Sequence, residues 1–241
     1  MARRVGVHPS AATRLAQRLG YRGYLELRED LRVDREELLT GSGAGDRFRN
    51  ELEEVGDATI LESLLSAEVD SLSALRKHVQ QSQIDQVADA LARAKRVHVY
   101  ARGNAGVLAE LMVRRMRRFG IPTTELSGDT RDLAEKTLQI ARGDVVVIFA
   151  FRKAPTTLPT LLKSVRGAEA TTVLVTDTLH MLTPTPDLVL SAPRGTTDGF
   201  ASLTVPMAVT NAVVLTMAAR HAHTVLPALD RLDSLINSFE E

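Results

Sequence analysis

The sequence predicts an α/β protein whose main part is a doubly wound parallel sheet of five strands, preceded by a small all-α segment. From residue 96 onward, short β-branched runs alternate with stretches of helical spacing, as in parallel sheets with right-handed crossovers. The apolar run from Asp144 to Ala150 is typical of a strand buried on both faces. The stretch from Thr40 to Gly45 is the clearest linker. We therefore expect a segment at 1–39, a linker at 40–45 and a domain at 46–241.

The first 39 residues are expected to form two helices. Residues 9–19 can begin at Ser10 as N-cap, and Gly20 supplies a stop. A second helix at about 22–39 carries leucines at helical spacing.

The large domain is expected to contain both helices and strands. Strands are predicted at 96–101, 121–126, 144–150, 171–176 and 188–191. Helices are predicted at 46–80, 84–94, about 106–119, 129–140, 156–166, 199–222 and 226–239. The helices at 46–80 and 199–222 carry more apolar surface than one sheet face readily buries. We therefore expect a homo-oligomer, either a dimer or a tetramer.

Composition excludes several classes of protein. The 241 residues are 44% apolar and 25% charged, which is ordinary for a globular protein. They include no cysteine, which excludes disulfides and thiolate metal sites. No apolar run has the length of a membrane span, and the N-terminus lacks the apolar core of a signal peptide. We expect a cytoplasmic protein with no membrane partner.

The net charge of zero conceals a basic N-terminal end. Residues 1–24 contain no acid, and their five arginines are Arg3, Arg4, Arg14, Arg18 and Arg22. A basic end favours a polyanion as its partner, and a solvated terminus explains the same charges equally well.

A ligand site is expected where the parallel strands end, because ligands of open α/β sheets bind beyond the carboxyl ends of strands. Small residues there open helices whose N–H groups favour phosphate or carboxylate, and basic side chains add charge. A solvated turn or an oligomer interface is the alternative for the basic pair Arg152 and Lys153. The candidate effector-binding residues are Gly103, Asn104, Ala105, Arg152, Lys153, Thr156, Thr176 and Asp177.

The sequence offers no positive sign of catalysis. No nucleophile elbow, Walker loop or paired catalytic carboxylates are found, and Asp177 has no base or nucleophile placed with it. His98 lies within a predicted strand and is interpreted as a core or interface residue. His221 and His223 are two apart on a predicted helix, so they are expected to point away from each other and to make a poor metal pair. We therefore expect a protein that is not an enzyme and that binds neither a cofactor nor a metal ion.

The whole chain resembles a known family. Residues 5–31 read VGVHPSAATRLAQRLGYRGYLELREDL and closely resemble the DNA-binding domain of RpiR/MurR-type transcriptional regulators. Residues 96–220 look like the sugar isomerase (SIS) domain of that family. The resemblance implies a recognition helix that presents Ser10, Thr13 and Arg14 to base edges of DNA. It further implies phosphate contacts from Arg3, Arg4, Arg18 and Arg22.

The chain departs from this family in two places. Only residues 1–7 precede the expected recognition helix, so the segment corresponds to the second half of such a domain. Either the true start lies upstream or the chain is truncated. A true truncation would weaken or abolish DNA binding. The family's phosphate loops, typically Gly-x-Gly-x-Ser and Ser-x-Ser-Gly-x-Thr, read ARGNA at 101–105 and AFRKAP at 150–155 here. The hydroxyls that would bind phosphate are therefore replaced.

The resemblance implies a regulator of transcription that a small effector controls, either a phosphorylated sugar or another anionic molecule. Two alternatives remain open at this point. One is a sugar-phosphate isomerase or binding protein of the SIS fold without DNA-binding activity. The other is an SIS protein that acts only by oligomerising with full-length relatives.

Overall fold

A computed structural model describes residues 24, 59–152, 154–177, 182–194 and 202–240. The chain divides into two compact units, one formed by residues 1–78 and 194–202 and the other by residues 79–193 and 203–241. The expected helices at 9–19 and 22–39 and the linker at 40–45 lie outside the described residues, apart from Tyr24. In the first unit, helix α4 spans Ile60–Leu75, inside the longer helix predicted at 46–80.

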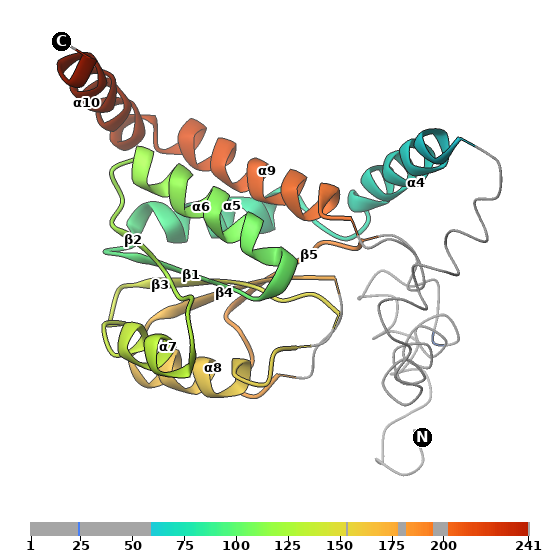
Figure 1. Cartoon of the computed structure of the whole chain (residues 1–241), viewed down its shortest axis with the longest axis horizontal. Coiled ribbons are helices and arrows are strands. Elements are labelled where there is room, and N and C mark those ends of the chain that lie inside the picture. Colours follow the sequence, from blue (N-terminus) through green and yellow to red (C-terminus); the bar gives the residue numbers. More distant parts are fainter. Residues whose placement is uncertain (1–23, 25–58, 153, 178–181, 195–201, 241) are drawn as a thin grey trace. The chain divides into compact units, whose positions relative to one another are not determined.

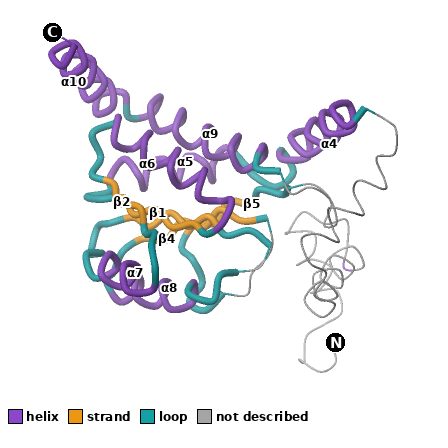
Figure 2. The backbone as a smooth tube through the Cα atoms, viewed as in Figure 1, coloured by secondary structure: helices purple, strands orange, loops and turns teal. Residues whose placement is uncertain are grey.

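The second unit is built on a parallel sheet of five strands, as the sequence predicts. The strands are β1 (Val97–Ala101), β2 (Thr123–Glu125), β3 (Val145–Phe149), β4 (Thr171–Thr176) and β5 (Leu188–Ser191). Their order in the sheet is β2-β1-β3-β4-β5, and every neighbouring pair is parallel. Figure 2 shows the strands as a single layer with helices on both sides. This is the doubly wound arrangement.

Helices cover both faces of the sheet because its central strands are apolar on both faces. Every residue of β1 and β3 is buried. Helices α5 (Gln81–Arg93), α6 (Gly106–Arg118) and α9 (Thr204–Arg220) lie on one face (Figure 1). Helices α7 (Thr130–Thr137) and α8 (Leu158–Gly167) cover the other, and α10 (Ala222–Glu240) follows α9.

The core under α7 and α8 includes two polar side chains of β1, His98 and Tyr100. Tyr100 is fully buried among apolar residues such as Ile148, Leu158 and Leu162. His98 is 1% exposed, and its Nε2 lies 3.1 Å from Oδ2 of Asp144. This confirms the interpretation of His98 as a core residue.

The end of α9 differs from the sequence prediction. The backbone of His221 (φ −121°, ψ 37°) ends α9, and α10 begins at the next residue rather than at 226. Because the helical spacing rule holds only inside one helix, the rings of His221 and His223 do not point apart, and their centroids are 6.2 Å apart. His221 Nε2 instead lies 2.8 Å from Oδ1 of Asp89 on α5.

The described part of the chain contains no group of three or more histidine, aspartate or glutamate side chains that could hold a metal ion. Nor does any of its helices combine the length and the apolar character needed to cross a membrane.

Candidate functional site

The strand order places the candidate site at the carboxyl ends of β1 and β3. From β1 the chain crosses through α6 to β2 on one side, and from β2 it returns through α7 to β3 on the other side of β1. The connections therefore diverge between β1 and β3, which is the switch point where open α/β sheets bind ligands. The loops that meet there are residues 102–105 after β1 and residues 150–157 after β3.

The loop after β1 is a single 3-10 turn, Gly103–Ala105, that leads directly into α6. Gly103 has φ +59°, a left-handed conformation that favours glycine, while a Cβ at this position would meet no atom within 4 Å. The backbone conformation rather than crowding therefore favours glycine here. Asn104 is exposed at the site, whereas the side chain of Ala105 is buried.

Arg102 connects this loop to two neighbouring segments. Its Nη1 donates a hydrogen bond to the carbonyl oxygen of Gly128, which precedes α7, at 2.8 Å. Its Nε lies 3.4 Å from the hydroxyl of Tyr100, and the guanidinium carbon lies 5.6 Å from the centre of the Tyr100 ring. The Tyr100 hydroxyl in turn lies 2.6 Å from Oγ1 of Thr157, the residue before α8. A cation is thereby fixed at the edge of the switch point.

The loop after β3 is tied to the end of β4. The backbone N–H of Arg152 donates a hydrogen bond to Oδ1 of Asp177 at 2.6 Å. Arg152 has φ +55°, which is unfavourable for a residue with a side chain. The Asp177 carboxylate thus helps to hold the loop in this conformation and acts as a positioning group. Lys153 lies outside the described residues.

The remaining candidates divide by exposure. Thr156 is exposed near the end of the loop, two residues before α8, whereas Thr176 is 3% exposed at the end of β4. Helices α6 and α8 both begin at this edge of the sheet, and the positive ends of their dipoles favour an anion there. The structure therefore brings Gly103, Asn104, Arg152, Thr156 and Asp177 to one edge, and their roles in binding an effector stay a prediction.

Sequence reasoning did not single out Tyr100, Arg102, Gly128 and Thr157. One signal was available, because Arg102 immediately precedes the predicted loop glycine, Gly103, and Tyr100 lies three positions before it. The other two residues are brought in by the fold: Thr157 is 57 positions from Tyr100, and Gly128 is 26 positions from Arg102.

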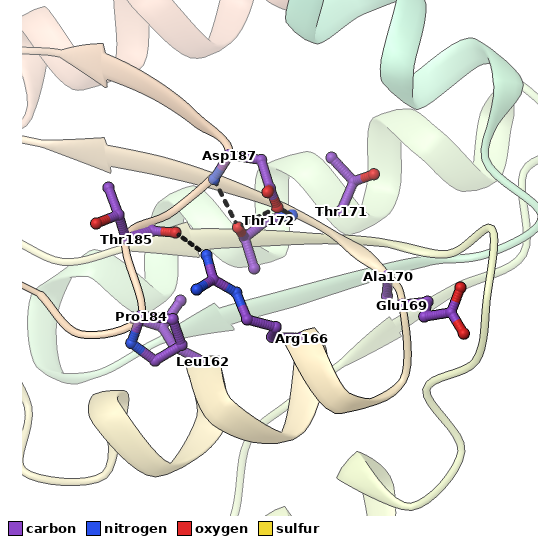
Figure 3. A pocket seen from close by; sticks show the side chains of 9 residues that line it. All are labelled: Leu162, Arg166, Glu169, Ala170, Thr171, Thr172, Pro184, Thr185 and Asp187. Carbon is purple, nitrogen blue, oxygen red and sulfur yellow. Dashed lines mark hydrogen bonds between the residues drawn. The ribbon is translucent and has the colours of Figure 1, made fainter.

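A hollow of about 380 Å³ lies elsewhere, where β4 begins and α8 ends (Figure 3). The side chain of Arg166 donates to the carbonyl oxygen of Thr185 at 2.9 Å. Oδ2 of Asp187 accepts hydrogen bonds from the backbone N–H and the hydroxyl of Thr172 at 2.8 and 2.6 Å. These groups join α8 and β4 to the segment before β5, so we assign them a structural role.

A family comparison gives the domain its identity. The family model described as "SIS domain" matches residues 90–226, more than half of the chain. The chain belongs to the SIS domain family. Among curated proteins, a relative named "Bifunctional protein glk" from Burkholderia thailandensis is 32% identical over 90 residues. That match spans 37% of this chain and only 13% of the relative.

Two solved structures share the fold of this chain. The sugar isomerase domain of an RpiR transcription factor from Sphaerobacter thermophilus aligns with a TM-score of 0.66 and 20% identity, over 73% of this chain and 98% of that one. The NanR protein of Vibrio vulnificus, complexed with ManNAc-6P, aligns with a TM-score of 0.64 and 17% identity, over 99% of this chain and 84% of that one. At these identities the likeness establishes the fold.

Proposed function

We propose that the protein is a transcriptional regulator of the RpiR type, in which a small anionic effector bound at the SIS domain controls DNA binding by a homo-oligomer. The observation that carries the proposal is the sequence of residues 5–31, which resembles the DNA-binding domain of that family and is joined to an SIS fold. Two solved structures with this fold lend support, because the Sphaerobacter protein is an RpiR transcription factor and the Vibrio protein is complexed with ManNAc-6P.

The chemistry of the switch point supports an anionic effector. The Arg102 guanidinium uses one N–H on Gly128 and points a second toward Tyr100, which leaves N–H groups of Nη1 and Nη2 for a ligand. The starts of α6 and α8 add partial positive charge. Because the hydroxyls of the family's phosphate loops are replaced, charge rather than a ring of hydroxyl donors would select the ligand. Phosphorylated sugars and sugar acids both meet that requirement.

Control of DNA binding would follow from a shift between arrangements of the oligomer. An effector that binds one arrangement more tightly than the other changes the spacing of two recognition helices, and thereby the affinity for paired half-sites. A binding role without catalysis fits the site, because the Asp177 carboxylate is engaged by the backbone of Arg152.

Effector binding is tested by isothermal titration of the full chain with a panel of sugar phosphates and sugar acids. Arg102→Ala is expected to weaken binding roughly tenfold or more, because a charge-assisted hydrogen bond is lost. Arg152→Gly removes the second guanidinium while accepting the positive φ. Arg131→Ala is the matched control, since Arg131 is an exposed arginine of α7 paired with Glu135. Equal binding by Arg102→Ala and wild type would refute the assigned role of Arg102.

DNA binding is tested by fluorescence anisotropy with the region upstream of the protein's own coding sequence. Affinity should fall steeply between two salt concentrations, because phosphate contacts release counterions. Arg14→Ala should weaken binding, whereas Arg131→Ala should not. No binding at low salt would refute a DNA-binding role for this chain. Interconversion of a sugar phosphate, followed by NMR, would instead favour the isomerase alternative.

A further inference from the structure

The segments that lead into β1, β2, β3 and β4 are rich in basic residues. Because these strands are parallel, their amino ends lie along one edge of the sheet, opposite the candidate effector site. The segments are residues 93–96, 117–122, 141–144 and 166–170. They carry seven cationic side chains, all exposed: Arg93, Lys95, Arg96, Arg117, Arg118, Arg142 and Arg166. We call these seven side chains the basic edge.

Carboxylates do little to neutralise the basic edge. The same four segments contain two acids, Asp144 and Glu169. Asp144 is 2% exposed, and its Oδ2 lies 3.1 Å from Nε2 of His98 and accepts the N–H of Ala141 at 3.0 Å. Glu169 lies 3.6 Å from Arg142, but the two side chains are 70% and 83% exposed, and such a pair contributes little. Seven exposed cations are therefore set against one exposed carboxylate.

Two of the cations are held in place by the backbone of the strands they precede. Nε and Nη2 of Arg117 donate hydrogen bonds to the carbonyl oxygen of Thr123 in β2, at 3.3 and 3.2 Å. The stem of Lys95 lies against Gly143, where a Cβ would come within 3.2 Å of its Cδ. Positions fixed in this way reduce the entropy lost on binding. Three other cations have no carboxylate partner in the described part of the chain: Arg93, Arg96 and Arg118.

Acidic residues limit the basic edge on two sides. The segment before β5, residues 182–187, contains Asp187 and no cation. On the side of α10, a Cβ at Gly120 would lie 3.2 Å from that of Ala228, so α10 passes close to the end of α6. The next acids along α10 are exposed, and they are Asp230 and Asp233. The positive surface is thus confined to the amino ends of β2, β1, β3 and β4.

The length of the basic edge suits the backbone of duplex DNA. Neighbouring strands lie about 4.8 Å apart, so the four strands span about 14 Å. One strand of DNA presents a phosphate about every 3.4 Å along the helix axis, so the edge matches about four consecutive phosphates. Six of the seven cations are arginines, whose planar guanidinium pairs with phosphate oxygens through two hydrogen bonds.

Other polyanions fit the basic edge less well. Proteins that bind single-stranded nucleic acid stack exposed aromatic rings on the bases, whereas the one aromatic residue of the four segments, Phe119, is 8% exposed. Surfaces that bind lipid combine basic residues with exposed Trp, Phe or Leu side chains. None of the large apolar side chains in the four segments is exposed. The chemistry therefore favours phosphates of a duplex over bases or a membrane.

We propose that the basic edge is a DNA-contacting surface of the SIS domain itself, which binds the phosphate backbone of duplex DNA without reading its sequence. Contacts of this kind position a protein on DNA and add affinity that depends on salt. The candidate effector site lies at the opposite edge of the sheet, so effector and DNA do not compete for the same surface. The inference goes beyond the proposed function, because it requires neither residues 1–39 nor an effector.

The test is fluorescence anisotropy of the full chain with a short labelled duplex of scrambled sequence, at several salt concentrations. The edge variant combines Arg93→Gln, Arg96→Gln and Arg118→Gln. It should weaken binding on the order of tenfold or more at low salt, and it should flatten the slope of log affinity against log salt by about 2 to 3. Arg96→Glu alone should act in the same direction. Circular dichroism shows whether each variant is folded.

A control variant removes the same charge from other parts of the domain. It combines Arg131→Gln, Lys163→Gln and Arg231→Gln, which are exposed residues of α7, α8 and α10. Its affinity and salt slope should stay close to those of the wild type. Equal losses in the edge and control variants would show that only net charge matters and would overturn the proposal.

Three further outcomes would overturn the proposal. The first is a wild-type chain that does not bind the scrambled duplex at low salt. The second is an edge variant whose affinity and salt slope equal those of the wild type. The third is tighter binding to single-stranded RNA of the same sequence, or to phosphatidylserine vesicles, than to the duplex, which would assign the edge to another partner.

The proposal and the proposed function can fail separately. A chain that binds an effector and its upstream DNA, with both affinities unchanged in the edge variant, would refute the DNA contact of the basic edge and leave the regulator standing. A chain that binds the scrambled duplex through the edge, with no response to Arg14→Ala and no effector in the panel, would refute the regulator and leave the basic edge as a DNA-contacting surface.

Discussion

Replacing Tyr100 with phenylalanine removes one hydroxyl from the candidate site and leaves the packing of the ring in place. That hydroxyl lies 2.6 Å from Oγ1 of Thr157 and so links the end of β1 directly to the residue before α8. The ring is fully buried against the α7/α8 side of the sheet. The variant therefore isolates the contribution of a single hydrogen bond that crosses the switch point.

The size of the effect follows from the environment of the hydroxyl. A hydrogen bond between uncharged groups contributes about 0.5–1.5 kcal/mol net, and Thr157 keeps a hydroxyl that must find another partner. The Arg102 Nε at 3.4 Å is too distant to add much. We expect the free energy of unfolding to fall by about 1 kcal/mol, which corresponds to a drop in Tm of roughly 2–4 °C for a domain of this size.

Urea unfolding followed by circular dichroism is the suitable assay, because the chain has no tryptophan and only three tyrosines. Thr157→Val removes the partner hydroxyl, and Thr157→Ser is the control that keeps it. If the bond stabilises the protein, the double variant should be less destabilised than the sum of the two single variants. A coupling energy below about 0.3 kcal/mol, or a Tyr100→Phe protein as stable as wild type, would refute the reasoning.

Two further predictions concern the rest of the domain. Hydrogen bonds from Arg220, and to a smaller extent from His221, hold the pKa of Asp89 well below its usual value. The ionised carboxylate therefore stabilises the folded state fully at any pH above the unfolded-state pKa of about 3.9. This stabilisation is lost as the pH falls through the lowered pKa of the folded state. The difference in Tm between wild type and Asp89→Asn should accordingly be largest above pH 5 and shrink below about pH 4; a constant difference would contradict this. Phe149→Ala should cost about 3–5 kcal/mol by leaving a cavity in β3, measurable by the same urea assay, and a loss below 1 kcal/mol would mean that the sheet collapses around the gap.

The strands could be predicted from the sequence because strands buried in a parallel sheet are runs of apolar, mostly β-branched residues. The boundaries predicted for residues 171–176 and 188–191 coincide with β4 and β5. The strand predicted at 121–126 is shortened to Thr123–Glu125. Ile121 lies outside the paired residues, since its N–H bonds back to Met116 at the end of α6. An apolar run in the sequence indicates a buried segment, whereas pairing with a neighbouring strand decides where each strand ends.

The candidate site was harder to predict because its contacts join distant segments. The loop residues after β1 and β3 were located correctly as lying at one sheet edge, which follows from parallel topology alone. The positive φ of Arg152 and its bond to Asp177 cannot be read from either residue. The break between α9 and α10 was misplaced for a similar reason, because the Asp89 carboxylate that engages His221 lies 132 positions away.

The two outer strands of the sheet disfavour strand pairing between copies of this domain. β2 has only three residues, and the carbonyl oxygen of its Thr123 accepts hydrogen bonds from Nε and Nη2 of Arg117 at 3.3 and 3.2 Å. β5 has four residues. Strands this short, one of them with an acceptor already occupied by a side chain, offer little template for a strand from another molecule. The short, partly occupied edges thereby protect the domain against edge-to-edge aggregation.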